Sequence, residues 1–151
     1  MRTVTKGLLA GAAGTVALNV VTYGDMLLRG RGSSDVPTQV ADRLVERTGV
    51  ELGDEESRSN REQAVGTLLG YVTGLGVGAA YGLLSRRRDG ALPAWAATPL
   101  LGIAAMAGSD GPATALGVTD PTSWSGSSWA SDVVPHLAYG LTTASVYQAL
   151  R

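Results

Sequence analysis

The 151-residue chain contains no cysteine and no phenylalanine, and it has one histidine and one lysine. Without cysteine it forms no disulfide and offers no thiolate nucleophile or cysteine metal ligand, and a single histidine excludes a multi-histidine metal site. The net charge of -1 gives no basic field for nucleic acid, and no nucleic-acid-binding motif is present. These absences predict a protein with no metal centre and no nucleic-acid partner.

Catalytic motifs are lacking as well. The sequence has no phosphate-binding glycine loop and no nucleophile elbow, and a serine, histidine and aspartate set would have to come from an exposed loop. The serine-rich stretch 123–128 contains tryptophan and is interpreted as a flexible lid at the membrane interface. We therefore expect no enzymatic activity and no cofactor.

Charge is almost absent from four long windows, 7–28, 64–84, 92–108 and 133–150. Of the 25 formal charges, 24 lie outside these windows. A soluble amphipathic helix needs charges on its outer face, whereas a membrane span needs about 20 mostly apolar residues. The pattern predicts an all-α, polytopic membrane protein, with one membrane domain over residues 1–151 and four transmembrane helices in a compact bundle. A cleaved signal peptide is an alternative for the first window, but no small-x-small cleavage site ends it.

The positions of the arginines predict the orientation in the cell membrane. The short loop 85–91 contains three arginines, whereas the loop 109–132 contains no lysine or arginine. Short basic loops stay in the cytoplasm, so both termini are expected there and the segment 29–63 outside. That outer segment holds six arginines and eight acidic residues of its own, and we let the short loops decide.

The outer segment is expected to contain a short amphipathic helix over 37–48. Ser34 or Asp35 can cap it, Pro37 suits a first helical turn, and Gly49 can end it. Such a short helix is marginal alone in water, so we expect it to rest on the membrane surface or on the bundle. The polar stretch 53–60 is predicted to be an unordered linker.

The third window is the shortest and contains Pro99. A length of 17 residues is the lower limit for a span, and a proline inside a helix removes one hydrogen bond. The following stretch, 110–118, is apolar enough to dip back towards the membrane. A re-entrant element is therefore an alternative to a full third span.

Glycines follow each other at every fourth position in the second window. Small residues at this spacing let two membrane helices approach backbone to backbone. We expect the first window, which has small residues of its own, to pack against this stripe within one protomer; self-association through a glycine zipper is the alternative. The packing glycines are Gly66, Gly70, Gly74, Gly78 and Gly82 in the second window and Gly7, Gly11 and Gly14 in the first.

The first window also contains polar residues, which are costly at membrane depth and are therefore candidates for function. Asn19 lies deepest, although an interhelical hydrogen bond is the commonest use of such a residue. Asp25 lies near the outer end, one helical turn before Arg29. A surface ion pair with Arg29 would explain Asp25 without any function.

The fourth window offers a second polar group. His136 and Tyr139 share one helical face, Asp132 lies one turn earlier, and Pro135 is expected in the first turn of the helix. In the predicted topology Asp25 also lies at the outer end of the bundle. Asp25, Asp132 and His136 could then share one proton-responsive pocket, against the alternative that the histidine is only structural.

Two stretches resemble an uncharacterised family of small four-helix actinobacterial membrane proteins. The first is NVVTYGDM at 19–26, and the second is DPTSW at 120–124 continuing to WASDVVPHLAYG at 129–140. The resemblance implies the four-helix membrane architecture and no known catalytic or transport signature. Eleven arginines against one lysine also fit a bacterial, GC-rich genome.

Two function classes follow. The first is a small non-enzymatic membrane protein, an accessory subunit or scaffold, whose partners are the lipid bilayer and a larger membrane complex or a second copy. The second is a small transporter or channel with a polar site in the outer leaflet. The deciding observation is whether the polar side chains face one continuous cavity or are sealed by their neighbours.

Overall fold

The computed structural model describes residues 2–50, 53–87 and 91–150. All regular structure in this part of the chain is helical, so the all-α prediction is confirmed. The elements are α1 (Thr3–Arg29), α2 (Val36–Thr48), α3 (Glu55–Arg87), α4 (Ala94–Ala115), the 3-10 turn η1 (Pro121–Ser123) and α5 (Gly126–Ala149).

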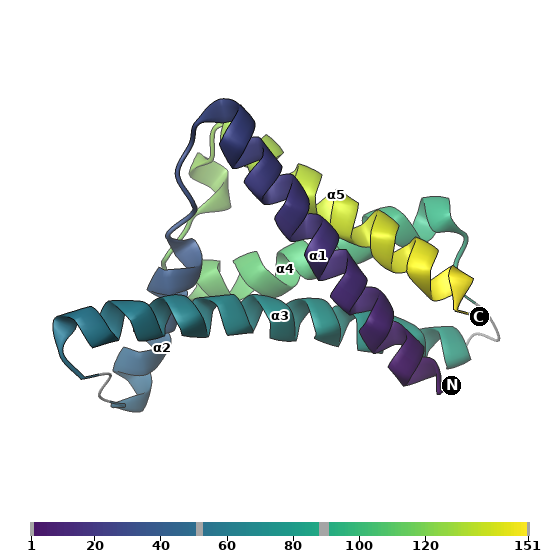
Figure 1. The fold of residues 1–151 in the computed structure, drawn as a ribbon, viewed down its shortest axis with the longest axis horizontal. Helices are drawn as coiled ribbons and strands as arrows, with labels where there is room; N and C mark the ends of the chain where they lie inside the picture. The colour runs from purple at the N-terminus through teal and green to yellow at the C-terminus, as the bar shows by residue number, and fades with distance from the viewer. Residues whose placement is uncertain (1, 51–52, 88–90, 151) are drawn as a thin grey trace.

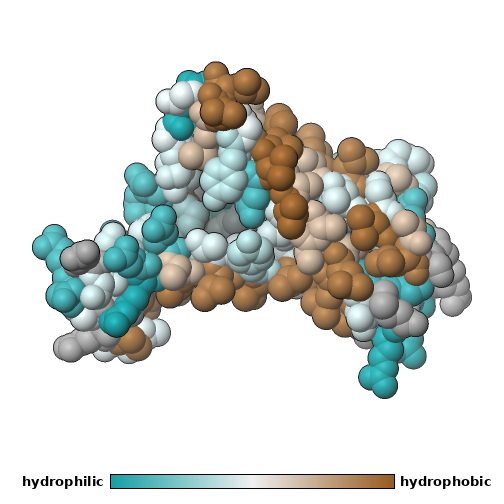
Figure 2. Space-filling view, in the orientation of Figure 1, coloured by the Kyte–Doolittle hydropathy of each residue, from teal (hydrophilic) through white to brown (hydrophobic). Residues whose placement is uncertain are grey.

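Two helices are long and apolar enough to cross a membrane. They are α1, with 27 residues, and the segment Ser57–Arg86 of α3, with 30 residues. Large apolar side chains face outwards, including Leu28, which is 87% exposed, and Val72, which is 66% exposed. Figure 2 shows this apolar surface along the outer sides of α1 and α3. A soluble monomer rarely exposes so much apolar surface, whereas lipid covers it without cost.

The helices come together at one end of the molecule and spread at the other (Figure 1). The start of α1, the end of α3, the start of α4 and the end of α5 lie at the packed end. There α1 packs against α3 and α5, and α5 packs against α4. At the spread end α1 and α3 diverge, and α2 packs on the first part of α3.

The polar stretch 53–60 does not form the unordered linker that the sequence predicts. The helix α3 begins at Glu55, nine residues before the apolar window 64–84. A carboxylate oxygen of Asp54 accepts the backbone N–H of Ser57 at 2.9 Å, which satisfies a free donor at the start of the helix. Local capping therefore orders a stretch that composition alone assigns to a loop.

The helix α4 is longer than the third window and continuous. It runs through both Pro99 and Pro112 and ends at Ala115. The residues 110–115, expected as part of a possible re-entrant element, extend this helix and do not turn back.

The helix α5 begins earlier than expected, and Pro135 lies inside it rather than in its first turn. The hydroxyl of Ser125 accepts the backbone N–H of Ser128 at 3.1 Å and so starts the helix at Gly126. The stretch 123–128, interpreted as a flexible lid, thus consists of the end of η1, this cap and the first turn of α5. A serine side chain that caps a helix is ordered by that bond.

Candidate functional site

The packed end brings α1 and α3 into backbone contact through glycines. A Cβ atom on Gly78 would lie 2.4 Å from the carbonyl oxygen of Gly7 and 2.7 Å from the Cα of Gly11. A Cβ on Gly74 would meet the side chain of α1 residue Thr15 at 2.1 Å. Any larger residue at these positions would hold the helices apart, because the nearest atoms belong mostly to the backbone.

The other predicted packing glycines have different neighbours. Gly82 also meets α1, but Gly14 faces α5, where an added Cβ would lie 2.1 Å from Oγ1 of Thr143. Gly66 faces α2, and a Cβ on Gly70 would have no neighbour within 4 Å. The expectation of one continuous groove for α1 is therefore wrong for Gly66 and Gly70. The reason is geometric, since residues four apart drift by about 40° around a helix and the two helices diverge.

Tyrosine side chains seal the packed end. The Tyr139 hydroxyl donates a 2.6 Å hydrogen bond to the carbonyl oxygen of Gly74, and Tyr139 is only 1% exposed. The hydroxyl of Tyr147 reaches the carbonyl oxygen of Gly82 at 3.4 Å, and its ring meets Tyr81 edge to face with centroids 5.0 Å apart. Among the described residues, these side chains fill the space between α1, α3 and α5 at this end.

The spread end contains a cavity of about 1440 Å³, which we call the polar cavity. It lies between the second half of α1, α2, the first half of α3, the end of α4 and the start of α5. Figure 2 shows the hollow between α1 and α3, with hydrophilic residues around it. Four of the five predicted site residues line this cavity: Asn19, Asp132, His136 and Tyr139.

The fifth predicted site residue, Asp25, does not line the polar cavity. Its carboxylate pairs with Arg29 at 2.6 Å and with Arg31 at 2.5 Å. It borders a smaller cavity of about 280 Å³ between α1 and α5, which shares some of its lining residues with the polar cavity. The expectation that Asp25 shares a pocket with Asp132 and His136 is wrong, because two guanidinium groups at the end of α1 hold its carboxylate.

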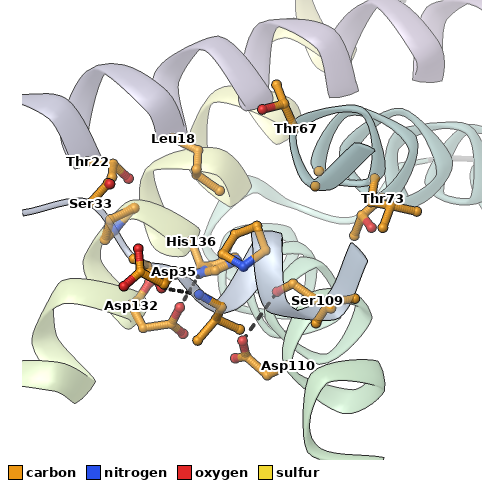
Figure 3. Close-up of a pocket in the computed structure, with 18 of the residues that line it drawn as sticks. Leu18, Thr22, Ser33, Asp35, Thr67, Thr73, Ser109, Asp110, Asp132 and His136 are labelled. Atoms are coloured by element: carbon orange, nitrogen blue, oxygen red, sulfur yellow. Dashed lines mark hydrogen bonds and ion pairs between the residues drawn. The ribbon is translucent and has the colours of Figure 1, made fainter. Parts of the chain in front are cut away.

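The structure adds Asp110, which lies in the predicted loop 109–132. It lies near the end of α4, and its carboxyl group lies close to that of Asp132 on α5. Figure 3 shows both carboxyl groups beside His136. The sequence contained an indication of this contact. The two aspartates flank the connection between two successive helices, so they come close together when these helices pack.

The environment of this carboxyl pair favours protonation. Both groups lie beyond the predicted spans 92–108 and 133–150. Burial, followed by the negative charge of Asp132, raises the pKa of Asp110 to about 6. Burial also raises the pKa of Asp132, and the charge of His136 acts against it. One Oδ2 atom of each carboxyl is buried without a donor, so a proton shared between them would satisfy both.

The imidazole of His136 is held in place by its own helix. Its Nδ1 donates to the carbonyl oxygen of Asp132 at 2.8 Å and lies 3.5 Å from a carboxylate oxygen of the same residue. A carbonyl oxygen only accepts, so the proton of this hydrogen bond is carried by Nδ1. Together with the amide of Asn19 and several serine and threonine hydroxyls, the imidazole gives the cavity wall both hydrogen-bond donors and acceptors.

The site has the chemistry of a binding cavity. In the part of the chain that the structure describes, no three histidine or acidic residues gather in a metal-binding arrangement. Comparison with family models, curated proteins and solved structures gives no match for this chain. The function is therefore argued from the geometry of the polar cavity.

Proposed function

We propose that this protein is a non-enzymatic, multi-pass membrane protein that binds a small, positively charged solute in the polar cavity. The observation that carries this proposal is that Asn19, Asp132 and His136, from two different helices, line one cavity. If the protein were only a scaffold, these polar side chains would be used for packing between helices. Side chains on a cavity wall remain free to contact a solute, which favours the transporter-like class.

The placement in the membrane is part of the proposal. Four spans, over 7–28, 64–84, 92–108 and 133–150, put the outward-facing apolar side chains in lipid. In the sequence, the arginines of 85–91 lie at or just after the end of α3 and before the start of α4, and these two helix ends lie at the packed end with the start of α1 and the end of α5. The positive-inside rule then places that end in the cytoplasm and the polar cavity towards the outside.

The charge of the cavity indicates the class of solute. The carboxyl groups of Asp35, Asp110 and Asp132 belong to its lining, whereas the lining guanidinium groups of Arg29 and Arg31 are paired with Asp25. Carboxyl groups in the lining favour a small organic cation over an anion. The tyrosine-sealed end closes the cavity on one side, so the structure supports a binding chamber rather than an open pore.

The proposal is tested with the purified protein in lipid nanodiscs. Because Trp124 borders the polar cavity, its fluorescence reports on occupancy by agmatine or tetraethylammonium, with acetate as the anionic control. We expect saturable quenching by the cations only. Asp132→Asn should weaken cation binding at least tenfold. The matched control Glu46→Gln removes an acid from the exposed face of α2 and should bind as the wild type does.

Two results would contradict the proposal. The first is the absence of saturable binding for any cation. The second is equal binding by Asp132→Asn and the wild type, which would mean that the cation sits elsewhere. The topology is tested separately in the cysteine-free chain: Arg87→Cys should be protected from an impermeant thiol reagent in intact cells, and labelling from outside would reverse the orientation.

A further inference from the structure

The helix α2 forms one wall of the polar cavity and is fastened weakly to the rest of the protein. Its residues Val36, Val40 and Leu44 belong to the cavity lining. Among its described residues only Val40 and Ala41 are buried. It packs on the first half of α3 and more lightly on α4. Val36 and Val45 are half-buried and most other residues of the helix are exposed, so the apolar area that opposes its movement is small.

The connections of α2 permit it to turn as a unit. The helix α1 ends at Gly30, which has a positive φ of 63°, and the segment 31–34 has no helical structure before α2 begins. The helix α2 itself ends at Gly49, which has a positive φ of 68°. Glycine adopts such angles without strain and also leaves them easily, so the chain can bend at these points.

Two contacts hold α2 in its observed position. The first is the backbone of Pro37 on Gly66, where an added Cβ would lie 2.6 Å from the Pro37 carbonyl oxygen. The second is the side chain of Arg58 on α3, which pairs with Asp42 of α2 and, at 2.6 Å, with Glu62 of its own helix. A glycine at position 66 and one half-exposed ion pair therefore decide whether the wall is closed.

We propose that α2 is a movable wall of the polar cavity, closed through Gly66 and latched by Arg58, and that its outward swing admits the solute. This inference rests on the proposed function for the identity of the solute. The movement itself depends only on the contacts of α2. Opening breaks the Arg58–Asp42 pair and uncovers Val40, and closing restores both.

The movement is measured by electron-spin distance measurements on the full chain in nanodiscs. The labels are attached to Arg47→Cys on α2 and Val72→Cys on α3, two exposed positions in a cysteine-free protein. In this background Gly66→Leu should shift the distance distribution away from the closed value. Gly76→Leu is the matched control, because nothing lies within 4 Å of a Cβ there, and it should leave the distribution unchanged.

A second variant protects the test against misfolding. Arg58→Gln keeps a long side chain that favours a helix but removes the ion pair with Asp42. The open population and the association rate of tetraethylammonium should therefore each rise about three- to fivefold. If neither Gly66→Leu nor Arg58→Gln changes the distance, the movable wall is wrong. If the distance changes but neither the wild type nor any variant binds a cation, the movement of α2 is supported and the proposed function is contradicted.

Discussion

The packed end and the spread end of this molecule are built from the same helices and differ in how closely these helices approach. At the packed end glycines occur on both partners, so α1 and α3 meet backbone to backbone at Gly7 and Gly78. At the spread end the glycines of α3 continue, but α1 carries Asn19 and larger side chains. A glycine on one helix alone leaves a space, and here that space is the polar cavity.

The two ends also use their polar groups differently. The hydroxyl of Tyr139 donates a hydrogen bond to the carbonyl oxygen of Gly74 at the boundary with the packed end, where this bond stabilises the contact between α3 and α5. Buried oxygen atoms without a hydrogen-bond partner occur at both ends, in Ser85 and Thr143 towards the packed end and in Asp110 and Asp132 at the spread end. Of these four residues only the two aspartates line the polar cavity, so the candidate binding groups lie at the spread end.

The largest expected effect breaks the packed end. Gly78→Leu places a side chain against backbone atoms of Gly7 and Gly11, which cannot move aside. We expect a loss of about 3 kcal/mol in the free energy of unfolding, or failure to fold. The measurement is thermal unfolding in detergent, with Gly76→Leu on the same helix as the control. Equal stability of the two variants would show that α1 and α3 are not in close contact.

A smaller effect, of opposite sign, is expected at the carboxyl pair. Because the pKa of Asp110 is raised to about 6, the folded protein holds more protons than the unfolded chain between about pH 4 and 6. This stabilisation is complete below pH 4 and is lost as the pH rises through about 6. Asp110→Asn should flatten that decline and stabilise the protein at pH 7 by about 1–2 kcal/mol. An unchanged pH profile of thermal unfolding would remove the pair from the site.

Tyr139→Phe tests whether the hydroxyl of Tyr139 only stabilises the helix contact or also binds the solute. The change removes the hydrogen bond to the Gly74 carbonyl, which should cost about 1 kcal/mol, since that carbonyl lies within a helix and keeps its helical environment. Tyr23→Phe, at an exposed position of α1 that also borders the polar cavity, is the control for stability alone. A loss of cation affinity larger than the loss of stability would show that the hydroxyl also contacts the solute.

The smallest effect is expected at Asp25, which the structure places outside the polar cavity. Asp25→Asn should leave cation affinity within about twofold of the wild type, because the Asp25 carboxylate itself does not line the polar cavity. Titration of the fluorescence signal with tetraethylammonium measures this. A tenfold change would mean that freed arginines alter the field of the cavity.

The sequence by itself determined which segments are helical and which faces are small, apolar or polar. Segregated charge and uninterrupted apolar windows require helices, and each window lies largely within one helix of the structure. The helix predicted over 37–48 corresponds to α2, because its first-turn proline and its final glycine act locally and the hydroxyl of Ser34 accepts the backbone N–H of Val36. Local chemistry is readable wherever the interacting residues lie within a few positions of each other.

Only the tertiary structure decided what lies opposite each face. Helical periodicity places Gly66 and Gly78 on one stripe. Because α1 crosses α3 near Gly78, that glycine contacts α1, whereas Gly66 contacts α2. The same crossing keeps Asp25 out of the polar cavity, while the packing of α4 on α5 brings Asp110 into it. Crossing angles depend on side-chain packing summed over whole helices, and no short motif encodes that sum.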